Sequence, residues 1–167
     1  IMQVYILKES NSDSRVAASP DTVKKMKDWG LNVVIQNDAG LNSNFSNEEY
    51  VKSGATISNE ITDISKSDLI LKINKPNNDE IALMNEGSVL IASLDPYNNS
   101  ETLNKLKDKG VTSFAMELMP RITRAQSMDI LSSQSNLAGY KAVIDATYLF
   151  NKAMPMMMTA AGTIAPA

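Results

Sequence analysis

The sequence predicts an α/β fold in which a mostly parallel sheet carries helices on both faces. Short apolar strands alternate with amphipathic helices from the start of the chain to Ala115. Three of the helices end at a glycine, Gly30, Gly87 or Gly110, placed directly before the next strand. Short strands without polar alternation are typical of a sheet buried on both faces, and right-handed crossovers then give a doubly wound arrangement.

The first strand-helix-strand unit has the clearest boundaries. Residues 3–7 (QVYIL) form an apolar, β-branched strand. Ser19 is placed to cap a helix that has Pro20 at its first position, and Gly30 ends that helix. The next strand is Asn32–Gln36.

The same pattern continues along the chain. Further helices are predicted at residues 47–52, 78–86 and 100–109, and further strands at residues 69–73, 88–92 and 112–115.

The pattern changes after Phe114. Residues 119–129 are expected to form a loop, and a long helix is expected at residues 133–152 because Leu137, Tyr140 and Ile144 share one stripe. Pro155 would end that helix. The predicted organisation is an N-terminal α/β subdomain at residues 1–132, followed at residues 133–167 by a long helix and a linker that lead out of that subdomain.

Composition narrows the possible functions. The chain has 43% hydrophobic and 21% charged residues, as ordinary globular domains have. A net charge of -3 does not indicate a basic surface that would bind nucleic acid. Histidine and cysteine are both absent, which removes the commonest general base and the commonest metal ligands. We therefore expect no metal, and chemistry that uses other side chains or needs no proton transfer.

No segment is a nucleotide cradle. No two of the seven glycines are separated by a single residue, so a GxGxxG fingerprint is absent, and the phosphate-binding P-loop pattern is absent too. There is also no apolar run of the roughly 18–20 residues that a membrane span needs, and no signal peptide pattern at the start.

Three cationic residues follow predicted strands, at the edge where ligands bind in parallel sheets. Arg15 follows the first strand and could clamp an anion, or it could be a solvated loop residue. Lys72 and Lys75 in the segment LKINKP could supply a buried functional amine, or they could end a strand with their charges in water.

The segment from Pro120 to Tyr140 is denser in polar groups. Arg121, Gln126 and Asp129 offer a fork of donors, an amide and an acceptor, which is the mixture that the hydroxyls and carboxamide of a nicotinamide ribose require. A structural alternative is open: Arg121 and Asp129 could pair, and Asp129 or Ser132 could cap the following helix.

The block PRITRAQSMDILSSQSNLAGYKAVIDA, with MMMTAAGTIAPA after it, closely resembles the first domain of nicotinamide nucleotide transhydrogenases. Weaker motifs such as LKINKP and FAME fall in the same order and are shared with alanine dehydrogenases. The resemblance spans essentially the whole chain. It implies a flavodoxin/Rossmann-like fold without its own GxGxxG. It also implies that the long C-terminal helix and linker lead to a Rossmann NAD-binding subdomain, missing here, that carries the glycine fingerprint.

The resemblance also implies a function. The chain would be the N-terminal portion of the NAD(H)-binding component (alpha subunit, domain I) of a proton-translocating NAD(P) transhydrogenase, which transfers hydride between NAD(H) and NADP(H). Arg121, Gln126 and Asp129 would be the catalytic positions, with Gln126 reaching toward NADP(H). The residues expected to contact the cofactor are Arg121, Ile122, Thr123, Gln126, Asp129 and Ser132.

Partners and location follow from the same resemblance. NADP(H) would be bound by a partner domain, a membrane domain would translocate protons, and the full protein would be a homodimer. The expected place is peripheral to the inner membrane, on the cytoplasmic side in a bacterium or the matrix or organelle side in a eukaryote. Because the fingerprint domain is absent, this chain alone is expected to be inactive.

Two alternatives stay open. One is a fragment of an alanine-dehydrogenase-type NAD-dependent oxidoreductase, in which Arg15 and a lysine of LKINKP bind a 2-oxo acid. That chemistry needs a base, and the position where that family has histidine reads Leu94-Asp95-Pro96. The other is a non-catalytic domain that only packs against partners.

Overall fold

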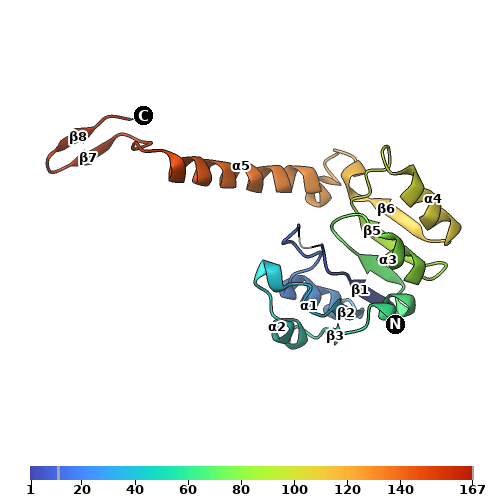
Figure 1. Ribbon diagram of the computed structural model, residues 1–167. Helices are drawn as coiled ribbons and strands as arrows, with labels where there is room; N and C mark the ends of the chain where they lie inside the picture. Colours follow the sequence, from blue (N-terminus) through green and yellow to red (C-terminus); the bar gives the residue numbers. More distant parts are fainter. Residues whose placement is uncertain (11, 167) are drawn as a thin grey trace. The chain divides into compact units, whose positions relative to one another are not determined.

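A computed structural model describes residues 1–10 and 12–166, and its first compact unit, Ile1–Met119, is built on one six-stranded sheet (Figure 1). The strand order is β3-β2-β1-β4-β5-β6, and every neighbouring pair is parallel. The strands are β1 (Gln3–Ile6), β2 (Asn32–Gln36), β3 (Thr56–Ser58), β4 (Leu69–Leu71), β5 (Val89–Ala92) and β6 (Thr112–Ala115). The predicted α/β fold class is confirmed.

Helices connect successive strands of this sheet. The α-helices are α1 (Pro20–Asp28), α2 (Asn47–Lys52), α3 (Asn78–Leu83) and α4 (Ser100–Asp108), and the short 3₁₀ turns are η1 (Leu41–Ser43), η2 (Ile61–Lys66) and η3 (Met116–Leu118). The strand order reverses between β1 and β4, and in open α/β sheets ligands bind beside such a reversal, at the carboxyl ends of the strands.

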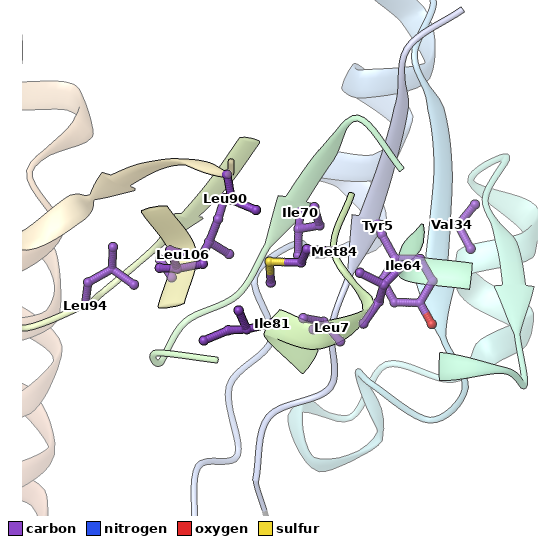
Figure 2. Packing of buried hydrophobic residues seen from close by; sticks show 12 residues of the cluster. Tyr5, Leu7, Val34, Ile64, Ile70, Ile81, Met84, Leu90, Leu94 and Leu106 are labelled. Carbon is purple, nitrogen blue, oxygen red and sulfur yellow. The ribbon is translucent and has the colours of Figure 1, made fainter. Parts of the chain in front are cut away.

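Alternate side chains of strands β1, β2 and β4 enter two separate cores. Tyr5 and Leu7 point into a core closed by α3 and α4, where Figure 2 shows them with Ile70, Leu90 and Leu106. Their neighbours Val4 and Ile6 enter the opposite core, which α1 and α2 close. Both sheet faces are therefore buried at β1, which explains why the sequence there is apolar without alternation.

The sequence signals at both ends of α1 act as predicted. The hydroxyl of Ser19 accepts the backbone N–H of Thr22 at the start of α1, and Gly30 has a left-handed φ of 82° after its end. Helices α2 and α3 each begin with a reciprocal capping box, formed by Ser46 with Glu49 and by Asn77 with Glu80.

Some predicted boundaries differ from the structure. Strand β3 was not predicted, because it is a three-residue edge strand with a weak apolar signal. Helix α3 ends at Leu83 and not at residue 86, because Met84 turns to extended backbone and buries its side chain.

The second compact unit is Pro120–Ala167. It contains the 3₁₀ turn η4 (Gln126–Met128), helix α5 (Ile130–Leu149) and a hairpin of β7 (Met157–Thr159) with β8 (Gly162–Ile164). Helix α5 begins three residues before the predicted start at 133, because Asp129 caps it. The hairpin was not predicted. The predicted boundary of this chain's N-terminal subdomain at residue 132 stays a prediction.

Helix α5 carries apolar side chains around its whole circumference. Leu137, Tyr140, Val143 and Tyr148 are all at least half exposed. Despite this apolar character, no helix in the described residues is long and hydrophobic enough to cross a bilayer.

One ion pair is buried inside the first unit. Lys72, at the end of β4, lies 2.6 Å from the Glu80 carboxylate, with side chains only 7% and 6% exposed. The other carboxylate oxygen of Glu80 accepts the N–H of Asn77 in the α3 capping box. The pair thus ties the end of β4 to the start of α3.

Breaking this pair is expected to destabilise the chain. Lys72→Met leaves a buried carboxylate without its cation and should lower the free energy of unfolding by about 3 kcal/mol. Adding Glu80→Gln removes the charge but keeps the capping box, so the double variant should recover more than half of that loss. Urea unfolding followed by circular dichroism measures both. Equal stabilities of the single and double variants would contradict this account.

Candidate functional site

Residues 121–132 curl around a pocket because successive tight turns fold the loop back on itself. The N–H of Ile122 donates to Pro120, that of Ala125 to Ile122 and that of Met128 to Ala125, each at 2.9 Å. Ala125 is buried at the centre of these turns. The polar side chains on either side of it are therefore brought to one place.

The pocket so formed has a volume of about 340 Å³. We call it the loop pocket, and six residues line it: Arg121, Ile122, Thr123, Gln126, Asp129 and Ser132. They are the six residues predicted to contact a cofactor, and the structure brings all of them together. Their roles toward a ligand stay a prediction.

Asp129 is the most fully engaged residue of the loop pocket. Its Oδ1 accepts the backbone N–H groups of Leu131 and Ser132 at 3.0 and 3.1 Å, which makes it the N-cap of α5. Its Oδ2 accepts the Ser132 hydroxyl at 2.7 Å. The capping role that the sequence left open is therefore real, and it belongs to Asp129.

The surroundings of Asp129 favour its ionised form. The hydrogen bond from the Ser132 hydroxyl is the largest cause that holds the pKa of the Asp129 carboxyl below its ordinary value. The two backbone N–H groups and the charge of Arg121 act in the same direction. The carboxylate is thus a permanent acceptor near neutral pH.

Three other side chains of the loop pocket keep their polar groups available. Arg121, Thr123 and Gln126 form no side-chain hydrogen bond with residues 1–10 or 12–166. Arg121 does not pair directly with Asp129, which was the structural alternative for these two residues. A ligand would meet a guanidinium fork, a hydroxyl and an amide there.

A second hollow, which we call the edge cleft, lies at the carboxyl ends of the strands in the first unit. Its volume is about 780 Å³. Acidic and polar side chains dominate the lining, which comprises Ser10, Ser12, Asp13, Asn74, Lys75, Ser93, Leu94, Asp95, Asn99 and Glu117.

Two carboxylates bind the backbone of this edge from within. Glu9 is 5% exposed and accepts the N–H groups of Ile73 and Asn74 at 2.6 and 3.2 Å. Glu117 accepts the N–H groups of Leu94, at 2.8 Å, and of Asp95. These N–H groups are thus already satisfied by the chain itself.

The cationic candidates of the sequence are also paired. Arg15 binds the Asp13 carboxylate through a contact of 2.7 Å, so the anion that it clamps belongs to its own loop. Lys75 donates to the Asn99 side chain. Lys72 is buried against Glu80, so the alternative in which its charge lies in water was wrong: α3 covers the end of β4.

Sequence reasoning missed Glu9 and Glu117. Both lie within three residues after the end of a strand, and a carboxylate there can reach the N–H groups of the neighbouring loop. Their position was the one available signal. Among the described residues, no group of three or more histidine, cysteine, aspartate or glutamate side chains could hold a metal ion.

The fold and the two hollows define an α/β domain of the doubly wound class, with a polar pocket on a loop outside its sheet. Comparison with protein families goes further: residues 5–138 match the model of the alanine dehydrogenase/PNT N-terminal domain. The chain belongs to this family.

Within that family, the transhydrogenases are more similar to this chain in sequence and structure than the alanine dehydrogenases are. An NAD(P) transhydrogenase alpha-subunit protein of Rhodospirillum rubrum is 46% identical over 99% of this chain and 45% of its own length. The crystal structure of transhydrogenase from Sinorhizobium meliloti is 51% identical, with a TM-score of 0.92 over 99% of this chain and 50% of that chain. A structure of L-alanine dehydrogenase is 26% identical, with a TM-score of 0.69 over 74% of this chain and 34% of that chain. The chain thus spans about half the length of these transhydrogenase relatives.

The Asp129 cap should respond to acid. Because the pKa of Asp129 is lowered in the folded chain, its contribution to α5 is fully present above about pH 4 and is lost as pH falls through the lower folded value. The amide proton shifts of Leu131 and Ser132 should titrate with a midpoint below the ordinary aspartate value. Asp129→Asn, a cap that does not titrate, serves as the control. A midpoint at or above pH 4 would contradict the assigned cause.

Proposed function

We propose that this chain is the N-terminal portion of the NAD(H)-binding component of a nicotinamide nucleotide transhydrogenase, which transfers hydride between NAD(H) and NADP(H). In this proposal the loop pocket contacts the nicotinamide end of NAD(H). The observation that carries it is the convergence of Arg121, Gln126, Asp129 and Ser132 on one pocket, in a chain that resembles transhydrogenases far more closely than alanine dehydrogenases.

The chemistry of direct hydride transfer suits such a pocket. A hydride moves between two nicotinamide rings without proton transfer, so the protein's task is to hold the reacting carbons about 3–3.5 Å apart. Donors and acceptors that fix a carboxamide and a ribose are what that task requires. A chain without histidine is then not at a disadvantage.

The rest of the machinery would lie outside this chain. We propose that a following domain with a glycine fingerprint cradles the remainder of NAD(H), that a partner domain carries NADP(H), and that a membrane domain couples the reaction to proton translocation. The chain itself would be peripheral to that membrane, within a homodimer, on the cytoplasmic side in a bacterium or the matrix side in a eukaryote. Residue Gln126 would face the NADP(H) side.

The edge cleft does not favour the alanine dehydrogenase alternative. A 2-oxo acid carries a carboxylate, whereas Asp13, Asp95 and Glu117 line this cleft and Lys75 is its one lining cation among the described residues. Arg15 is already engaged by Asp13. Burying a substrate carboxylate beside these acidic groups would be unfavourable.

Arg121 should matter more than its neighbour Arg124, which is also exposed but does not line the loop pocket. In the full-length protein, Arg121→Ala should slow hydride transfer about tenfold or more, because a charge-assisted contact with the nucleotide is lost. Arg124→Ala should stay within about twofold of the wild type. Stopped-flow measurement of hydride transfer tests both. Equal rates for the two variants would count against the proposed pocket.

The 167-residue chain alone should bind NADH weakly or not at all, since it lacks a glycine-rich phosphate cradle. Titration calorimetry with the chain and with the full-length protein compares the two affinities. Low-micromolar binding to the chain alone would show that the nucleotide site is complete within it, which this proposal does not allow.

A further inference from the structure

One face of the six-stranded sheet loses its cover between β4 and β6. The strand register places one row of side chains across this face from β1 to β6: Ile6, Leu71, Ile91 and Phe114. Ile6 is fully buried at one end of the row, whereas Phe114 is 56% exposed at the other end, and the two residues between them are partly exposed. On the opposite face of the same strands, Ile70 and Leu90 are fully buried. The two faces are therefore covered to different extents.

The handedness of the connections explains this difference. From β1 the chain proceeds to β2 and β3 in one direction, and α1 and α2 cover that half of the sheet on the face of Ile6. From β4 to β6 it proceeds in the opposite direction, so right-handed crossovers place α3 and α4 on the other face. Among the described residues, no crossover of this sheet thus covers β5 and β6 on the face of Ile6.

The uncovered part of the sheet is largely apolar. We call it the open face and define it by four residues: Val89, Ile91, Thr112 and Phe114. Within the part of the chain that the structure describes, these residues belong to neither core. Strand β5 reads VLIA, without the polar alternation of a strand that has one face in water. The sequence of β5 is thus that of a strand covered on both faces.

The width of the open face matches that of one helix. The face spans two strands, which lie about 4.8 Å apart, and a helix with its side chains is about 10 Å across. A second copy of this chain fits less well. Each partner of a stable complex buries roughly 800 Å², and four side chains, two of them already partly buried, supply far less.

We infer that a helix from the part of the full-length protein that this chain does not include packs its apolar stripe on the open face and completes the first unit. The inference rests on the proposed function, in which this chain is the N-terminal portion of a longer protein. The relatives have the length for such a helix, since the chain spans 45% of the Rhodospirillum rubrum protein and 50% of the Sinorhizobium meliloti chain. The full-length chain would thus return to its first unit after building another domain.

Photochemical cross-linking in the full-length protein identifies what covers the open face. The photo-reactive residue p-benzoylphenylalanine replaces Phe114, and unlabelled chains are mixed equally with heavy-isotope-labelled chains. Irradiation should join position 114 to a peptide from beyond residue 167, with the same label on both peptides because they belong to one chain. Val51 is the control site, since it is exposed to nearly the same extent, 54%, on α2. The same group placed there should not be joined to that peptide.

Each result of the cross-linking decides a different statement. A cross-link between chains of different label overturns the inference in favour of a second copy. A cross-link to residues 1–167, to another protein or to no peptide at all overturns it as well. Hydride transfer by the full-length wild type is measured separately. Its absence overturns the proposed function, whereas a cross-link beyond residue 167 still supports the helix on the open face.

A charge on the open face provides a second measurement. In the full-length protein, Phe114→Asp should lower the thermal unfolding midpoint by about 5 °C or more, because the covering helix would bury a carboxylate without a partner. Val51→Asp should stay within about 2 °C of the wild type. Failure of Phe114→Asp to fold, with Val51→Asp folded, counts as the expected loss. Equal shifts of the two variants overturn the inference.

Discussion

The pairing of β1 with β4 joins the two halves of the sheet, and the Glu9 carboxylate extends that joint beyond the strands. The N–H of Leu7 donates to the carbonyl oxygen of Leu71 at 3.1 Å, which continues the ladder between the two strands. Beyond it, the Glu9 carboxylate accepts two N–H groups of the loop after β4. A buried N–H without a partner would cost roughly 1–3 kcal/mol. Two loops are therefore held in register by one buried side chain, and the position of the edge cleft depends on it.

Similar side-chain to backbone hydrogen bonds occur elsewhere along the edge. Glu117 accepts a backbone N–H of the loop after β5, and the side-chain oxygen of Gln36 accepts the N–H of Lys8. In a dinucleotide-binding sheet of this strand order, backbone N–H groups at the strand ends face the phosphates of the ligand. Here carboxylates of the chain occupy backbone donors at that edge. The backbone donors at this edge are therefore occupied by the chain itself, whereas the polar side chains of the loop pocket lie on the loop before α5.

Local signals predicted most of the first unit: Ser19 and Gly30 marked the ends of α1, and apolar runs marked five of the strands of the sheet. They could not predict β3, whose three residues gain their partners from β2. For the loop pocket, residue chemistry left capping and ligand contact as alternatives at Asp129. The structure shows the cap, and contact with a ligand stays a prediction. Glu9 and Glu117 could be found only from the tertiary arrangement. The backbone partners of Glu9 lie 64 and 65 residues away in the sequence, and those of Glu117 lie 22 and 23 residues away.

The hydrogen bonds that the chain itself completes at this edge have a consequence for the rigidity of the sheet. A ligand stabilises a protein by preferring its folded form, and a site whose polar groups are incomplete without ligand softens each time the ligand leaves. Glu9 and Glu117 already complete the backbone hydrogen bonds at this edge. The sheet should therefore keep one geometry whether or not a ligand lies at this edge, because these backbone donors do not depend on a ligand for their hydrogen bonds.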